Sequence, residues 1–208
     1  MASNAKPATQ ARSAALQAAF LEAGFKLLNE TTLDKLSVND IAQAAGSSVG
    51  GFYSRFKNKE AFYLCLRDEQ VKRGAAFVDD NLPEELLQQG EMSEVIAAVV
   101  DTYRAIFTSS GRGVLRTTFM KLHEDPDMWE PMRASGRHAS DYLSSHLGPR
   151  LGPDGPQRAR FAVQVLMSVL VNDLVNPNHP FKVDQPEFRN YLIDLLTPFL
   201  ASDNPGSN

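Results

Sequence analysis

Cysteine, long apolar runs and strand patterns are scarce in this chain of 208 residues. The single cysteine, Cys65, excludes a disulfide framework within one chain. We interpret it as a small apolar helix residue, with a redox-sensing thiol as the alternative. The most apolar stretch, residues 161–175, contains Gln164, Asn172 and Asp173 and is shorter than the roughly 20 residues that span a membrane. No segment alternates apolar and polar residues cleanly, so strand signals are poor.

Signals for secretion and catalysis are also missing. Residues 1–10 are polar and lack the apolar core of a signal peptide, so we expect a cytoplasmic protein that does not enter a membrane. The four histidines have neither the spacing of metal ligands nor cysteine partners. Ser54 and Lys57 match the Ser-x-x-Lys pattern of acyl-enzymes, but the companion motifs are absent. We therefore expect neither an enzyme nor a metal or cofactor site.

Charge is unevenly distributed along the chain. The net charge is −4, yet residues 1–60 hold seven Lys/Arg and five Asp/Glu, while the remainder holds fourteen and twenty. The N-terminal part is therefore mildly basic on an acidic protein, which is compatible with DNA binding.

Apolar residues recur at helical spacing, which predicts an all-α protein. We expect helices at about residues 12–29, 38–45, 48–56, 58–79, 93–108, 115–122, 126–147, 157–176 and 185–201. Gly111 and Gly113 should interrupt the pattern. Residues 80–90 should form a connection or a short helix, and the glycine- and proline-rich residues 148–156 a loop. The expected organisation is a disordered arm (1–11), a three-helix domain (12–60), a larger helical domain (61–201) and a disordered tail (202–208).

The most informative stretch begins at Ser37, and we interpret it as two short helices joined by a tight turn. Ser37 and Asp40 have the spacing of a capping box at the start of the first helix. Gly46 permits the positive φ that a sharp turn needs. Phe52 and Phe56, four residues apart, give the second helix an apolar side. The arrangement is typical of a helix-turn-helix, whose second helix enters the major groove of DNA.

The outer side of that second helix consists of small residues. They are Ser47, Ser48, Val49, Gly50 and Gly51. Adjacent glycines cost a helix roughly 1 kcal/mol each relative to alanine, which a purely structural helix would not normally accept. Adjacent glycines are useful in a helix whose backbone must closely approach a phosphate or a base edge. The residues that follow can donate hydrogen bonds or positive charge to phosphates: Tyr53, Arg55, Lys57 and Lys59.

This stretch resembles the DNA-binding domain of TetR-type transcriptional regulators. The matching positions are Ser37, Ile41-Ala42, Ala45-Gly46, Gly50, Phe52-Tyr53, Phe56 and Lys59-Glu60. With the first helix, the resemblance covers roughly residues 12–62, and the rest of the chain is similar only in length and helical character. Two positions depart from the family pattern, because Thr32 stands where glycine is common and Ser47 stands where an apolar residue is usual.

The resemblance implies a DNA-contact set. Its members are Ser37, Ser47, Ser48, Val49, Gly50, Gly51, Tyr53 and Lys59. Ser37 would cap its helix near a phosphate, and Val49 would contact a thymine methyl group. Tyr53 and Lys59 would bind phosphates. The alternatives are that Tyr53 is a half-buried packing residue and that Lys59 is a solvated charge near a helix cap.

For the larger domain, the resemblance implies ligand binding and dimerisation. The dimer candidates are Phe161, Val165, Val169, Phe188, Leu192, Leu195 and Phe199, with intrachain core as the alternative. The ligand candidates are Tyr103, Phe107, Phe119, His123, Trp129, Met167 and Asn172, most of which could equally be ordinary core.

Taken together, these patterns predict a transcriptional regulator, with repression as the family's usual mode. It would bind a roughly palindromic double-stranded DNA operator as a homodimer. A small, apolar effector would release it by preferring a conformer with wrongly spaced recognition helices. The alternative is a helical protein-interaction module without DNA binding.

Overall fold

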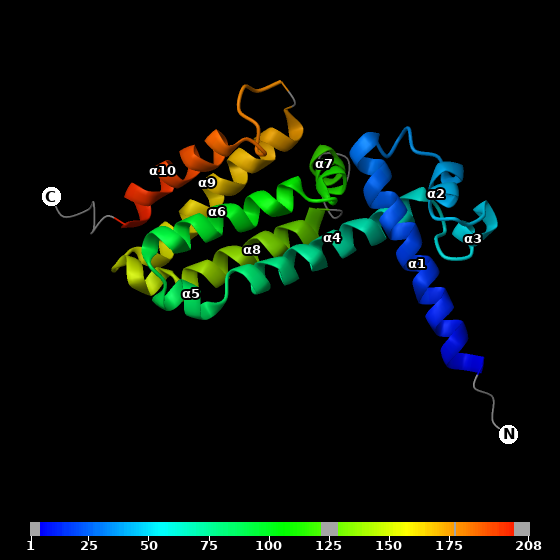
Figure 1. The fold of residues 1–208 in the computed structure, drawn as a ribbon, viewed down its shortest axis with the longest axis horizontal. Coiled ribbons are helices and arrows are strands. Elements are labelled where there is room, and N and C mark those ends of the chain that lie inside the picture. Colours follow the sequence, from blue (N-terminus) through cyan, green and yellow to red (C-terminus); the bar gives the residue numbers. More distant parts are fainter. Residues whose placement is uncertain (1–4, 122–128, 177, 202–208) are drawn as a thin grey trace.

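The computed structural model describes residues 5–121, 129–176 and 178–201, and this part of the chain is helical without strands (Figure 1). The helices form a small N-terminal group and a larger bundle. Each group has its own cluster of buried apolar side chains. Within the described ranges, no helix has both the length and the apolar character needed to cross a membrane. The predicted disordered tail, residues 202–208, lies outside them.

The N-terminal group contains α1 (Ala5–Glu30), α2 (Val38–Ala44) and α3 (Val49–Tyr53). Helix α1 begins earlier than residue 12, so residues 5–11 are helical rather than part of a disordered arm. The alanine-rich sequence favours a helix there. Pro7 is tolerated because it stands in the first turn, where its missing N–H would have no intrahelical acceptor.

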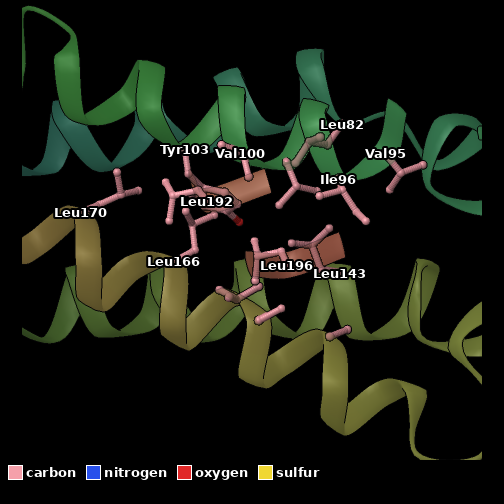
Figure 2. Close-up of a cluster of buried hydrophobic side chains, with 14 of the residues drawn as sticks. Leu82, Val95, Ile96, Val100, Tyr103, Leu143, Leu166, Leu170, Leu192 and Leu196 are labelled. Carbon is pink, nitrogen blue, oxygen red and sulfur yellow. The ribbon is translucent and has the colours of Figure 1, made fainter. Parts of the chain in front are cut away.

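The larger bundle contains the remaining helices. They are α4 (Lys59–Asn81), α5 (Glu84–Gln89), α6 (Met92–Thr108), α7 (Arg112–Met120), α8 (Glu130–His146), the 3-10 helix η2 (Gly148–Leu151), α9 (Gly155–Val175) and α10 (Pro186–Ala201). Figure 2 shows its core, where side chains of α6 face those of α8, α9 and α10. Residues 148–156 are therefore not simply a loop, because η2 and the start of α9 occupy most of them.

Helix α4 belongs to both groups. Asn58 caps its N-terminus by accepting a hydrogen bond from the backbone N–H of Ala61 (2.8 Å). Phe62 and Tyr63 near that end lie in the N-terminal core, whereas Val78 near the other end lies in the core of the bundle. The same continuous helix therefore connects the two cores (Figure 1).

Gly113 does not interrupt a helix, contrary to the sequence-based expectation. It lies in the first turn of α7, and Gly111 is the residue just before that helix. A Cβ on Gly113 would overlap the backbone carbonyl of Leu28, so the glycine lets α7 pack directly against α1. The contact is reinforced by Asn29, whose Oδ1 accepts a hydrogen bond from the N–H of Gly113 (2.7 Å).

Arg116 on α7 adds a second contact with the end of α1. Its guanidinium donates to the backbone carbonyl of Leu28 (2.9 Å) and to that of Thr31 (3.1 Å). Carbonyls at a helix C-terminus have no intrahelical partner, and here the bundle supplies one. The N-terminal group is thereby fixed to the bundle at α7 as well as through α4.

Candidate nucleic-acid interface

The turn between α2 and α3 forms as its sequence predicted. Ser37 Oγ accepts a hydrogen bond from the N–H of Asp40 (3.1 Å), and the Asp40 carboxylate accepts from the N–H of Ser37 (3.1 Å), which completes the capping box. Hydrogen bonds from the Ser37 side chain and backbone lower the pKa of Asp40. Gly46 follows α2 with φ +62°, a value that residues with a side chain rarely adopt.

Helix α3 is anchored by one face. Phe52 is fully buried, and its ring contacts that of Phe20 on α1 with centroids 5.8 Å apart. Ser48 caps the helix by accepting a hydrogen bond from the N–H of Gly51 (3.1 Å). A helix this short depends on such packing and capping, because isolated helices of a few residues are unstable in water.

The opposite face of α3 is open. The side chains of Val49 and Tyr53 are 39% and 56% exposed. At Gly50, the nearest atom to a hypothetical Cβ is Ser48 Oγ at 3.7 Å, so the rest of the fold does not cover this glycine. Gly51 is half-buried, and a Cβ there would overlap the hydroxyl of Ser47. The structure therefore brings the predicted α3 residues together on one accessible, nearly side-chain-free surface.

The Lys59 ammonium contacts the segment that precedes α2. It donates to the backbone carbonyls of Asp34 (3.3 Å) and Leu36 (3.0 Å), in the segment that leads into α2. Lys59 is therefore not simply a solvated charge, and its role in phosphate binding stays a prediction. Lys57 is exposed nearby. Arg55 packs back onto α3, where its guanidinium donates to the carbonyl of Gly51 (3.3 Å).

The comparison with known families decides what this arrangement is. Residues 20–65 match the model of the family described as "Bacterial regulatory proteins, tetR family". This segment of the chain therefore belongs to the family of tetR-type bacterial regulatory proteins. It contains α2, α3 and most of the N-terminal core, and it is a helix-turn-helix DNA-binding domain.

Similar proteins support the assignment. The uncharacterized HTH-type transcriptional regulator YwcC of Bacillus subtilis (strain 168) is 44% identical over 55 residues, which span 26% of this chain and 25% of YwcC. A regulator from Mesorhizobium loti MAFF303099, assigned to the TetR family, has a similar fold with a TM-score of 0.74. Its identity is 15%, and the match covers 91% of this chain and 97% of that one. A transcriptional regulator from Rhodococcus sp. Rha1 matches with a TM-score of 0.66 at 18% identity, over 90% and 95% of the two chains.

A second candidate site is a cavity of about 820 Å³ in the bundle, lined by residues of α4, α6, α7, α8 and α9. Five predicted ligand residues line it, namely Tyr103, Phe107, Phe119, Trp129 and Met167. Asn172 does not, because the cavity side of α9 passes through Met167, Ser168 and Val171, and Asn172 is turned to solvent. His123 lies outside the described residues.

The arginines that line this cavity form ion pairs with carboxylates. The lining residues Arg133 and Arg137 both donate to the carboxylate of Glu130, at 3.1 and 2.6 Å. Arg160, also a lining residue, donates to Asp141 (3.0 Å). Hydrogen bonding to Arg137 lowers the pKa of Glu130. The lining arginines therefore already have carboxylate partners within the chain.

The predicted dimer residues divide into two groups. Phe161 and Leu195 are each 53% exposed, while Val165, Val169 and Phe199 are half-buried. Phe188 and Leu192 are only 5% and 4% exposed and lie in the core of the bundle, so their prediction as interface residues was wrong. The inward face of α10 continues through Leu196 and Leu200 at intervals of four, which sequence spacing alone did not distinguish from the outward one.

Proposed function

We propose that this TetR-family protein is a transcriptional repressor that binds a roughly palindromic operator as a homodimer and is released by a small, largely apolar ligand. The observation that carries the proposal is the uncovered face of α3. A Cβ at Gly50 would meet only the hydroxyl of Ser48, at 3.7 Å, and the side chains of Val49 and Tyr53 on the same helix are exposed. A helix with so little side-chain bulk lets its backbone approach a base edge or phosphate closely.

Individual residues of this face have distinct proposed roles. Val49 offers methyl groups for an apolar contact with a thymine methyl. The exposed Tyr53 hydroxyl would donate to a phosphate, and the Lys59 ammonium would retain one N–H for a phosphate after donating to two carbonyls. Ser37 and Ser48 cap their helices, so they fix the orientation of α2 and α3 on the duplex.

The proposed partner for the outer face of α9 and α10 is a second copy of the chain. Phe161 and Val175 on α9 and Tyr191 and Leu195 on α10 are exposed apolar or aromatic side chains. The ring centroids of Phe161 and Phe199 are 5.6 Å apart, so the two helices are in contact at this part of the surface. A two-fold axis through that surface would pair it with itself and place two α3 helices on one duplex.

Ligand release would act through α7 and α4. Leu115 and Phe119 of α7 line the cavity, while Gly113 and Arg116 of the same helix contact α1. A ligand that binds one position of α7 more tightly than another would shift the DNA-binding domain relative to the dimer.

The test is fluorescence anisotropy with duplexes from the DNA that flanks the gene of this protein. We expect specific binding to one duplex with two-fold symmetry, and we expect Tyr53→Phe to weaken binding to all duplexes. Phe77→Leu is the control, because Phe77 is a 38% exposed aromatic residue of α4 that belongs neither to α3, nor to the cavity lining, nor to the proposed dimer surface. Equal binding by the two variants would contradict the proposed role of α3, as would a protein that binds every duplex alike.

A further inference from the structure

Two glycines on the cavity wall have no packing partner. Gly74 stands in α4 and Gly136 in α8, and both line the cavity. A Cβ added at either position would have no atom within 4 Å. On α4 the lining residues are Gln70, Val71, Gly74, Ala75, Val78 and Asp79, so Gly74 is at the centre of the face that α4 turns to the cavity.

These positions differ from the glycines that the fold itself requires. At Gly24 a Cβ would lie 2.6 Å from Phe62, and at Gly113 it would overlap Leu28. Glycine in the interior of a helix is less favourable than any residue except proline, so it persists where something excludes a side chain. Among the described residues, nothing excludes a side chain at Gly74 or Gly136.

A third residue that lines the cavity has an unsatisfied hydrogen-bonding group. Tyr103 lines the cavity and is 3% exposed, yet its hydroxyl has no hydrogen-bond partner among the residues that the structure describes. The comparable hydroxyls are satisfied, because Tyr63 bonds Thr118 (2.5 Å) and Tyr142 donates to the carbonyl of Leu82 (2.8 Å). A buried hydroxyl without a partner is unfavourable, and a rotation of the Tyr103 side chain would bring this hydroxyl, which is not itself exposed to the cavity, to a ligand oxygen.

We propose that Gly74 and Gly136 keep open the binding place of a neutral, largely apolar ligand that carries a ring and one oxygen acceptor. The inference rests on the ligand-binding part of the proposed function. The ring would pack among Phe107, Phe119 and Trp129, and the acceptor would take the hydrogen bond of Tyr103. The ligand is neutral because the lining arginines already pair with Glu130 and Asp141.

The cavity of about 820 Å³ has the size of sites that hold drug-sized molecules. Its apolar lining would bury most of such a ligand. A methyl group at Gly74 or Gly136 would occupy space that the ligand needs, although it meets nothing in the empty cavity. Ligand affinity and helix stability should therefore change in opposite directions in the alanine variants.

Three probes of one shape test the ligand class. They are phenylbutyl methyl ketone, its hydrocarbon analogue with isopropyl in place of acetyl, and phenylpentanoate, which has a carboxylate there. Binding is followed on DNA-free protein by the emission of Trp129, which is the single tryptophan of the chain and lines the cavity. We expect the ketone to bind wild type, and we expect Tyr103→Phe to weaken the ketone about tenfold while leaving the hydrocarbon unchanged.

The glycine variants complete the experiment. Gly74→Ala and Gly136→Ala should each weaken the ketone by about tenfold or more while raising the Tm by about 2–4 °C. Ala76→Gly is the control, because Ala76 is an exposed residue of α4 outside the cavity lining. It should lower the Tm and leave probe affinity unchanged.

Three outcomes would overturn the inference: no binding of any probe, unchanged affinity in both alanine variants, or tighter binding of phenylpentanoate than of the ketone. Because no DNA is present, these outcomes are independent of whether the protein recognises an operator.

Discussion

Replacing Lys59 by alanine separates the structural contact of this residue from its proposed contact with a DNA phosphate. Its ammonium donates to the carbonyls of Asp34 and Leu36. A charged donor strengthens each hydrogen bond, but the side chain is only half-buried, so we expect the loss of both bonds to cost about 1–2 kcal/mol. For a chain of this length, that lowers the Tm by roughly 2–8 °C.

The same substitution should change the salt dependence of DNA binding. Each lost phosphate contact lowers the slope of log K against log salt concentration by about 0.9, and a dimer loses two such contacts. The measurement is anisotropy of a labelled operator duplex across a salt series, together with thermal unfolding. Lys57→Ala is the control for stability, because Lys57 is exposed and should leave the Tm unchanged.

Two results would refute parts of this reasoning. A Lys59→Ala variant with a lowered Tm and the wild-type salt slope would show that the ammonium only fixes the segment before α2. A variant with the wild-type Tm would show that the two carbonyl contacts contribute nothing to stability.

Three further predictions concern the bundle. Gly113→Ala should destabilise the fold by about 1–3 kcal/mol in urea unfolding, because its Cβ overlaps the Leu28 carbonyl, and wild-type stability would show that α7 can move away freely. Leu195→Asp should convert the proposed dimer to a folded monomer in sedimentation, because it puts a charge on the exposed face of α10, and a dimer that persists would assign dimerisation to another surface. Tyr103→Phe should raise the free energy of unfolding of the ligand-free protein by about 1 kcal/mol, because the buried Tyr103 hydroxyl has no hydrogen-bond partner among the described residues. The same burial raises the pKa of Tyr103. A lower Tm in this variant would show that the hydroxyl makes a stabilising hydrogen bond.

The features that sequence predicted best are local ones. The capping box of Ser37 and Asp40 and the positive φ of Gly46 depend on residues within a few positions of each other. Residue type and spacing determine such contacts directly. The helix-turn-helix could therefore be recognised before any tertiary structure was known.

The features that sequence missed depend on which neighbour a helix face meets. Phe188 and Leu192 belong to an apolar stripe, but spacing does not tell whether that stripe faces the chain's own core or a second copy. Gly113 suggested a helix break, although the real constraint is the carbonyl of Leu28, eighty-five positions earlier in the chain. Asn172 was placed in the cavity from its residue type, and a rotation of one position along α9 puts it outside.

The contact between α7 and the end of α1 has a consequence for how the molecule comes apart. The carbonyls of Leu28 and Thr31 receive hydrogen bonds from Arg116 on α7, a helix that follows α4 and α6 along the chain. An excised fragment that ends within α4 would leave these acceptors without that donor, and its core would lack Val114, which is fully buried in the N-terminal cluster. The two cores should therefore unfold in a single cooperative transition. The helix-turn-helix domain, once excised, should be unable to fold by itself.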